Sequence, residues 1–202
     1  MTSIEVEQGV TLEGQYHRPA DARATVVLSH PHPQYGGDMH NPLIQHLFMS
    51  LPEVGIATLR YNFRGVSASS GSHDGGVGER QDVAAALAAG AGLGASGPLV
   101  SVGWSFGADV SLAVNSDLHA AWVAIAAPLA IVDPAEMTAA TDPRPTLLLV
   151  PEHDQFRTPD QAAHVTAEWA ATTVTTIEGG DHFLMGRTHL VVGEVEGFIS
   201  SL

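Results

Sequence analysis

The 202-residue sequence contains no cysteine and no lysine. The absence of cysteine excludes disulfides, thiolate metal ligands and a cysteine nucleophile. The absence of lysine excludes Schiff-base and serine–lysine chemistry. Basic residues are scarce as well, because 8 arginines face 22 aspartates and glutamates, which gives a formal net charge of −14. A chain with this charge repels phosphate backbones and anionic lipids, so we expect no nucleic-acid partner and no membrane partner.

Long apolar runs are also missing. The longest run extends from Ala120 to Val132, is interrupted by Pro128, and falls short of the roughly 20 residues that a bilayer span needs. The first residues show no charged segment followed by an apolar one, so we expect no secretory signal and a cytoplasmic location. Hydrophobic residues make up 45% of the chain, which is enough for a core. The length fits about one domain, so residues 1–202 are expected to form a single domain.

The order of the apolar segments predicts an α/β fold. Ser3–Glu7 and Val10–His17 are expected to pair as a hairpin, and strands and helices alternate after them. Buried strands joined by helices are typical of a mostly parallel sheet with helices on both faces. Ligands of such sheets bind at the carboxyl ends of the strands. The expected later strands are 24–29, 56–63, 99–103, 121–126, 146–150 and 173–177, and the expected helices are 42–51, 79–91, 106–115, 159–171 and 186–201.

Helix signals are clearest at three places. Asn41 followed by Pro42 predicts an N-cap and a first helical residue. Thr158, Pro159 and Gln161 fit a capping box with proline at the first position. The last helix has apolar residues spaced for one buried face, namely Val191, Val195, Phe198 and Leu202.

Residues 103–107 read Gly-Trp-Ser-Phe-Gly and match the motif G-x-S-x-G. An apolar strand precedes the motif and a helical pattern follows it, which is the context that the motif requires. Such a turn would hold Ser105 in a strained backbone conformation and present its hydroxyl above the sheet. Small residues at 103 and 107 would let the strand and the helix approach. The competing interpretation is a glycine-flanked turn with an ordinary serine.

A nucleophilic serine needs a base, and the base needs an orienting carboxylate. His182 follows the strand expected to end at Ile177, and Asp154 follows the strand expected to end at Val150. The order serine, acid, histidine is the one that this motif carries. We therefore predict Ser105, Asp154 and His182 as catalytic residues. Glu152 and Asp181 remain rival acids, and an ordinary surface loop remains the alternative for His182.

Three further segments carry a family resemblance: His30-Pro31-His32-Pro33, Gly36-Gly37-Asp38-Met39 and Asn62-Phe63-Arg64-Gly65-Val66. With the motif around Ser105, the chain resembles the α/β-hydrolase superfamily over nearly its whole length. More narrowly, it resembles small bacterial hydrolases without a cap domain. The resemblance implies the α/β-hydrolase fold and no cofactor. One departure is Ser67-Ala68-Ser69, where the family usually has Gly-x-Ser, and we expect it to alter only a loop.

The resemblance also implies an oxyanion hole built from backbone N–H groups. Phe106 would supply one, and the loop after the first central strand would supply the other. Pro31 and Pro33 have no N–H, so we predict His32 as the second donor. Gln34, Tyr35 and Trp104 are predicted to line the substrate pocket, although packing is the simpler role for Trp104.

A metal site at His30, His32 and His40 is the alternative for these histidines. We expect none, because zinc usually needs three protein ligands and no acidic residue joins them at a suitable spacing. Arg64 is expected to have a structural role. The segment from Ala127 to Pro145 is too short for a helical lid, so we expect no cap domain and an open site.

These features predict a serine hydrolase that cleaves small carboxylic esters through an acyl-enzyme. Its partner would be a small-molecule ester or thioester. A thioesterase or an amidase with the same triad is the enzymatic alternative. A catalytically silent ligand-binding protein on the same scaffold is the alternative from another class. The sequence does not determine the oligomeric state.

Overall fold

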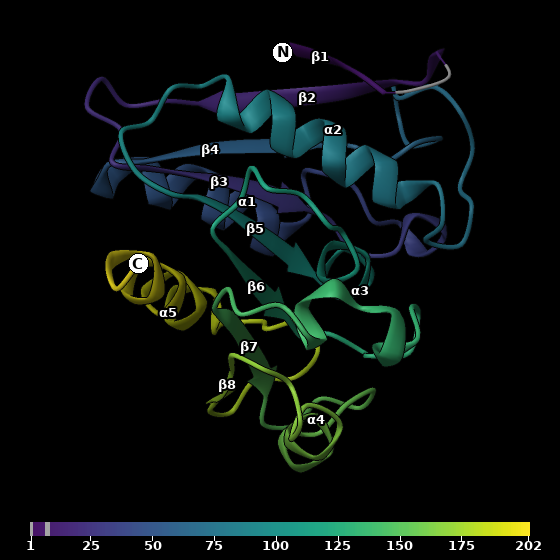
Figure 1. Cartoon of the computed structure of the whole chain (residues 1–202), viewed down its shortest axis with the longest axis vertical. Helices are drawn as coiled ribbons and strands as arrows, with labels where there is room; N and C mark the ends of the chain where they lie inside the picture. Colours follow the sequence, from purple (N-terminus) through teal and green to yellow (C-terminus); the bar gives the residue numbers. More distant parts are fainter. Residues whose placement is uncertain (1, 7–8) are drawn as a thin grey trace.

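One sheet of eight strands organises the computed structural model, which describes residues 2–6 and 9–202 (Figure 1). The strands lie in the order β1-β2-β4-β3-β5-β6-β7-β8. The pairs β1–β2 and β2–β4 are antiparallel, and all the other neighbours are parallel. The expected α/β-hydrolase architecture is therefore confirmed; Glu7, the expected end of the first strand, lies outside the described residues. The strands are β1 (Thr2–Glu5), β2 (Thr11–His17), β3 (Ala24–Ser29), β4 (Ile56–Tyr61), β5 (Leu99–Trp104), β6 (Ala121–Ile125), β7 (Thr146–Pro151) and β8 (Thr172–Ile177).

Helices cover both faces of this sheet. Figure 1 shows α2 in front of the strands and α1 behind them. Successive side chains of a strand point to opposite faces: in β3, Val26 and Leu28 pack with α1 and α5, whereas Val27 packs with α2. The central strands are therefore buried throughout, which explains their continuous apolar runs. The helices are α1 (Pro42–Ser50), α2 (Glu79–Ala91), α3 (Phe106–Leu112), α4 (Pro159–Val165) and α5 (Thr188–Ser200).

The predicted bounds of three helices were wrong. The helix α3 ends at Leu112 rather than at residue 115, and α4 ends at Val165 rather than at residue 171. Its capping box at Thr158 is confirmed. After α4, Thr166 takes the C-cap position and bonds its own hydroxyl to the Ala162 carbonyl at 3.0 Å. The helix α5 cannot include Gly186, because that residue has a left-handed φ of 71°.

The buried face of α5 also differs from its prediction. Val191 and Val195 are buried as expected, and Ile199 is the third buried residue. Leu202, which was predicted to be buried, follows the end of the helix and is 44% exposed. Phe198 is only partly buried against the core. A spacing of four residues keeps one stripe toward the sheet over two turns, which explains why residue 199 replaces residue 202.

The carboxyl ends of the parallel strands are where the predicted chemistry converges. From β3 the chain passes to β4 on one side, and β5 lies on the other side of β3. Such a reversal of strand order opens a crevice at the carboxyl ends of the two strands. The segment between β6 and β7 contains only two short 3₁₀ turns, Pro134–Glu136 and Thr138–Ala140. Among the described helices, none has both the length and the apolar character to cross a membrane.

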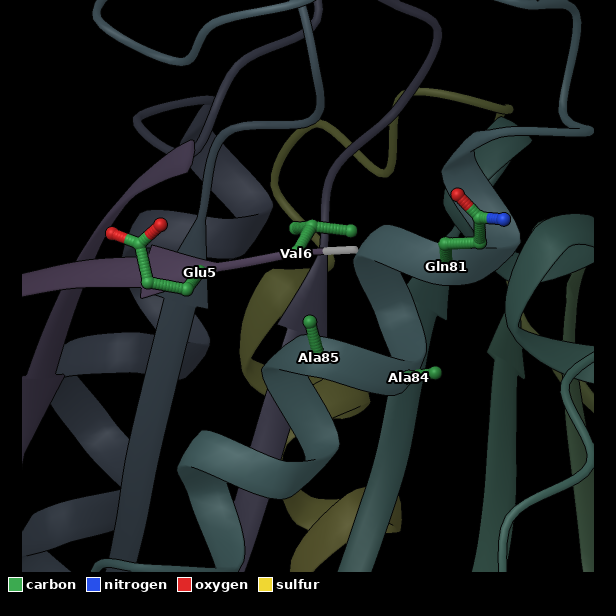
Figure 2. A pocket seen from close by; sticks show the side chains of 5 residues that line it. All are labelled: Glu5, Val6, Gln81, Ala84 and Ala85. Carbon is green, nitrogen blue, oxygen red and sulfur yellow. The ribbon is translucent and has the colours of Figure 1, made fainter. Parts of the chain in front are cut away.

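A hollow of about 370 Å³ lies between β1 and α2, away from these strand ends (Figure 2). Val6 faces Ala85 across it, and Ala84 and Gln81 complete the side formed by the helix. The Glu5 carboxylate at its edge accepts hydrogen bonds from the hydroxyls of Ser3 and Thr11 at 3.4 and 3.2 Å. The described residues of its lining include no hydroxyl nucleophile and no imidazole, so they lack the groups of hydrolytic chemistry.

Candidate active site

Ser105 occupies a sharp turn between β5 and α3. Its φ and ψ are 55° and −117°, a strained conformation for a residue with a side chain. The Ser105 N–H bonds to the Ile125 carbonyl at 2.9 Å, and the Ser105 carbonyl accepts from the N–H groups of Ala108 and Asp109. These bonds hold the strained turn in place. The expected backbone strain at Ser105 is therefore confirmed.

The two glycines of the motif are required by close backbone approach. A Cβ atom added at Gly103 would overlap the backbone of Gly107 on the following helix. A Cβ atom at Gly107 would overlap the carbonyl groups of Ser29 and His30 at the end of β3. The absence of side chains thus lets α3 begin directly above β5 and beside β3. This is the close approach that the sequence predicts.

His182 and Asp154 lie in line with the Ser105 hydroxyl. The His182 Nε2 atom is 2.9 Å from Ser105 Oγ, and His182 Nδ1 is 2.8 Å from Asp154 Oδ2. Asp154 and His182 are both nearly buried, at 3% and 5% exposed. With Nδ1–H donating to the carboxylate, Nε2 is left as the acceptor for the serine proton. The structure brings together the three residues that the sequence analysis selected.

The rival carboxylates have other partners. Glu152 Oε2 accepts from the Gly179 N–H at 2.7 Å, and Asp181 Oδ1 accepts from the Phe183 N–H at 3.1 Å. Both side chains belong to exposed residues. Neither carboxylate has a hydrogen bond to the imidazole of His182 among the described residues. Of the three candidates, Asp154 is therefore the one that contacts this ring.

Backbone groups and a guanidinium fix the position of Asp154. Its Oδ1 atom accepts from the N–H groups of Phe156 at 2.8 Å and Arg157 at 3.3 Å. The Arg157 side chain donates to the Pro128 and Leu129 carbonyls on the loop after β6. The loop that carries the acid is thereby tied to its neighbouring loop. Sequence reasoning identified Asp154 but not this support.

The buried carboxylate of Asp109 holds the same loop after β6 from the other side. It accepts from three successive backbone N–H groups, those of residues 129, 130 and 131, each at 2.9 Å. Burial raises the pKa of Asp109, and these hydrogen bonds oppose the shift. Because Asp109 lies on α3 one turn after Ser105, it connects the nucleophile turn to the loop that Arg157 contacts.

The loop after β3 curls around the carbonyl of His32. This oxygen accepts from the N–H groups of Tyr35 and Gly37 at 3.1 and 3.0 Å. A Cβ atom at Gly37 would overlap the Pro31 carbonyl, so only glycine permits this turn. The His32 and Phe106 rings pack with centroids 4.9 Å apart. Neither the His32 N–H nor the Phe106 N–H has an acceptor within the described parts of the chain, which leaves both donors free as an oxyanion hole requires.

His30 and Asn62 connect the two segments that carried the family resemblance. The buried His30 ring accepts the Phe63 N–H at Nε2 (3.0 Å), and its Nδ1 lies 2.6 Å from the Pro31 carbonyl. Asn62 Oδ1 accepts the Met39 N–H at 2.8 Å. Burial lowers the pKa of His30 to about 4, so the ring is neutral at pH 7. Both of its nitrogens are engaged with the backbone, and no group of three His, Asp or Glu side chains in the described residues is arranged to hold a metal ion.

Arg64 has a structural role, as expected, in an ion pair with a residue of α2. Its guanidinium donates to the buried Asp82 carboxylate at 2.7 and 3.0 Å, and its backbone N–H donates to the same group. The hydrogen bonds and charge of Asp82 raise the pKa of Arg64. The Arg64 side chain therefore binds α2 and has a structural role rather than a ligand-binding one.

Known proteins resemble this chain in both sequence and structure. The uncharacterized protein RP471 of Rickettsia prowazekii (strain Madrid E) is 30% identical over 196 residues, which cover 88% of this chain and 79% of that protein. An α/β serine hydrolase homologue from Coxiella burnetii has a structure that superposes with a TM-score of 0.84 at 28% identity, covering 100% of this chain and 96% of the other. The chain belongs to the α/β-hydrolase superfamily. No family model matches it.

A second hydrolase structure agrees with the absence of a cap domain in this α/β hydrolase. XC6422 from Xanthomonas campestris, described as an α/β serine hydrolase without a lid, is 27% identical with a TM-score of 0.84, covering 97% of this chain and 91% of that one. In the present hydrolase, the segment between β6 and β7 contributes short 3₁₀ turns where a lid would be inserted. The prediction of a hydrolase fold without a lid is confirmed.

A cavity of about 410 Å³ opens at Ser105 and His182. Tyr35 and Trp104, two of the three residues predicted for the substrate pocket, line this cavity. The indole Nε1–H of Trp104 also donates to the His182 carbonyl at 3.3 Å, so this residue supports the base as well. Gln34 does not line the cavity. It faces a separate hollow on the other side of the loop after β3, because the turn at residues 33–35 directs it outward.

Sequence reasoning missed four residues near the centre of the site. Phe156 and Phe183 line the cavity, and no sequence motif marks them. His73 packs against the rings of His32 and Phe106, with centroids 5.0 and 5.4 Å apart. The fully buried Glu79 carboxylate lies 2.7 Å from His73 Nδ1 and accepts two backbone N–H groups of the preceding loop. An acidic residue at the start of a helix is ordinary in sequence, so burial is the signal that distinguishes Glu79.

Proposed function

We propose that this hydrolase cleaves small carboxylic esters through an acyl-enzyme formed on Ser105. The observation that carries the proposal is the line of hydrogen bonds from Ser105 Oγ through the His182 ring to Asp154, at 2.9 and 2.8 Å. A hydroxyl is a weak nucleophile until an adjacent base takes its proton. The Asp154 carboxylate keeps the imidazole in the tautomer that can do so.

The first half-reaction acylates the serine. Ser105 Oγ attacks the ester carbonyl while its proton passes to His182 Nε2. The carbonyl oxygen becomes an oxyanion that the N–H groups of Phe106 and His32 stabilise. The tetrahedral intermediate then collapses: the bond to the alkoxy group breaks, and His182 returns the proton to the departing alcohol. The acyl group remains on Ser105.

Water completes the cycle by the same steps in reverse order. His182 takes a proton from water, and the oxygen attacks the acyl carbonyl. The second tetrahedral intermediate expels Ser105 Oγ, which recovers its proton from His182. An open site without a lid admits water freely, which favours hydrolysis over transfer to another acceptor.

The charge of the protein favours a neutral ester over an acyl-CoA thioester. The described residues that line the cavity include no arginine, and the chain has no lysine and a net charge of −14. A ligand with several phosphates would be repelled by this field. Amide substrates share the same geometry, and no feature of the cavity favours them.

Fluorophosphonate labelling combined with a substrate panel tests the proposal. The wild-type protein should be labelled at Ser105 and should hydrolyse 4-nitrophenyl acetate faster than acetyl-CoA. The Ser105→Ala variant should lose labelling and about 10⁴-fold or more of the turnover. A fold control by circular dichroism should show unchanged melting. Wild-type protein that resists the probe and hydrolyses no ester would instead indicate the ligand-binding alternative.

A further inference from the structure

The cavity at Ser105 has an unusual lining for this chain. Tyrosine, tryptophan and phenylalanine make up 6% of the sequence, yet they supply four of the ten residues around the cavity. Among the residues that the structure describes, no alanine, valine, isoleucine, leucine or methionine lines it, although hydrophobic residues of these and related types make up 45% of the chain. Apart from Pro31, the apolar walls of the site are therefore aromatic rings.

Two of these rings flank the predicted base. The Phe156 ring meets the His182 ring edge to face with centroids 4.5 Å apart, and Phe183 meets it at 5.7 Å. Phe156 is 58% exposed and Phe183 is 55% exposed, so both residues remain accessible to a ligand. Phe156 comes from the loop after β7 and Phe183 from the loop after β8, so two separate loops place them beside one imidazole.

The reaction fixes which part of a substrate would reach these rings. His182 Nε2 must donate its proton to the oxygen of the leaving alcohol, so the group attached to that oxygen lies beside His182. That position is next to Phe156 and Phe183. The carbonyl oxygen points instead toward the N–H groups of Phe106 and His32, and the acyl group takes the remaining direction at the carbonyl carbon.

We infer that the substrates are neutral esters of aromatic alcohols, with the aromatic ring of the alcohol held by Phe156 and Phe183. This inference rests on the proposed function and adds the class of leaving group. A flat ring can contact both phenylalanines in an open site, and each aromatic pair adds affinity beyond the burial of area. A flexible alkyl group loses rotamer freedom on ordering and finds Pro31 as the one aliphatic side chain among the described lining residues. The absence of arginine in the lining matches an uncharged ring.

Benzyl acetate and cyclohexylmethyl acetate form the decisive pair of substrates. They share the acyl group and the carbon skeleton of the leaving alcohol, and they differ in the aromaticity and flatness of the ring. We expect kcat/KM to be higher for benzyl acetate than for cyclohexylmethyl acetate, by about 2- to 12-fold for each phenylalanine ring that the benzyl ring contacts. Equal rates, or a preference for cyclohexylmethyl acetate, would overturn the inference. The reversed pair, ethyl phenylacetate and ethyl cyclohexylacetate, places the ring on the acyl side. Its ratio of kcat/KM, aromatic over cyclohexyl, should be smaller.

Single variants assign the preference to the two rings. Phe156→Leu and Phe183→Leu keep an apolar side chain at exposed positions and remove the aromatic face. Each should lower the benzyl-to-cyclohexylmethyl ratio about 2- to 12-fold, mainly through a higher KM for benzyl acetate. Tyr16→Leu, an exposed tyrosine on β2 outside the cavity, is the matched control and should leave the ratio unchanged. An equal loss toward both substrates in the phenylalanine variants would contradict a specific ring contact.

A binding measurement separates this inference from the proposed function. The Ser105→Ala variant is titrated with benzyl acetate and with cyclohexylmethyl acetate, followed by NMR shifts of the Trp104 indole. Tighter binding of benzyl acetate that Phe183→Leu abolishes supports the aromatic site even if no ester is turned over. Indistinguishable binding overturns it even if Ser105-dependent ester hydrolysis is observed.

Discussion

Replacing Asp154 with asparagine should disable the base by changing its tautomer. In the native site, Asp154 Oδ1 accepts from the N–H groups of Phe156 and Arg157, and Oδ2 faces His182 Nδ1. The asparagine oxygen must keep the Oδ1 position to serve the two N–H groups. Its NH₂ group then faces Nδ1 and can only donate to it. The imidazole proton moves to Nε2, which can no longer accept from Ser105.

The smallest expected loss of kcat depends on how easily the asparagine amide can turn over and present its oxygen to His182. Turning the amide would restore an acceptor for His182 but would place NH₂ against two backbone N–H groups. Leaving these two partly buried donors unpaired costs up to about 1–3 kcal/mol each, or up to about 2–6 kcal/mol together. The wrong tautomer itself costs about 10⁴-fold in kcat in a serine protease triad. Because about 1.4 kcal/mol corresponds to a factor of ten, we expect kcat to fall by about 30- to 10⁴-fold in Asp154→Asn.

Steady-state hydrolysis of 4-nitrophenyl acetate measures this loss, with Glu152→Gln and Asp181→Asn as matched controls. Both controls also change a carboxylate to an amide, and their kcat should stay within about threefold of the wild-type value. Thermal melting should show that Asp154→Asn folds, because its two backbone hydrogen bonds persist. A kcat within tenfold of wild type, or a larger loss in Glu152→Gln, would refute the reasoning.

Three further predictions follow from the backbone and from buried histidines. In steady-state kinetics, His32→Ala should retain kcat within about tenfold of wild type, whereas His32→Pro should lose about 10²- to 10³-fold in kcat. The native φ of His32, −57°, already suits proline, so the loss in folded His32→Pro would report the missing N–H. Equal activity of the two variants would exclude this N–H as an oxyanion donor. Ser67 has a φ of 50°, so Ser67→Gly should raise the free energy of unfolding by up to about 1 kcal/mol in urea titrations. The control Ala68→Gly, in the same loop, should lower the free energy of unfolding. A lower free energy of unfolding in Ser67→Gly would contradict strain at this position. Burial lowers the pKa values of His30 and His119 to about 4, helped at His119 by the charge of Arg144. Because the unfolded imidazoles bind protons near pH 6.5 and the folded ones do not, the free energy of unfolding should fall between pH 6.5 and pH 5 by up to about 1.4 kcal/mol per pH unit for each histidine. A free energy of unfolding that stays constant over this range would show that these rings are protonated in the folded protein.

The local chain determined the nucleophile turn and the alternation of strands and helices. An apolar strand, two glycines around Ser105 and a helical pattern after Phe106 constrain neighbouring residues only. Their backbone geometry therefore follows from short-range sterics, and the strained φ of Ser105 appears where the motif predicts it. The parallel sheet followed in the same way from continuous apolar runs joined by helices.

Tertiary structure decided what depends on residues from separate loops. Glu152, Asp154 and Asp181 are equivalent carboxylates in the sequence, and only the folded loops direct Asp154 to His182 while backbone N–H groups occupy the others. Gln34 and Tyr35 are neighbours in the chain, yet one turn of 3₁₀ helix directs them to different hollows. Phe156 and Phe183 meet at one imidazole because β7 and β8 are adjacent and parallel. Such convergence has no local signature, because any exposed phenylalanine obeys the same short-range physics.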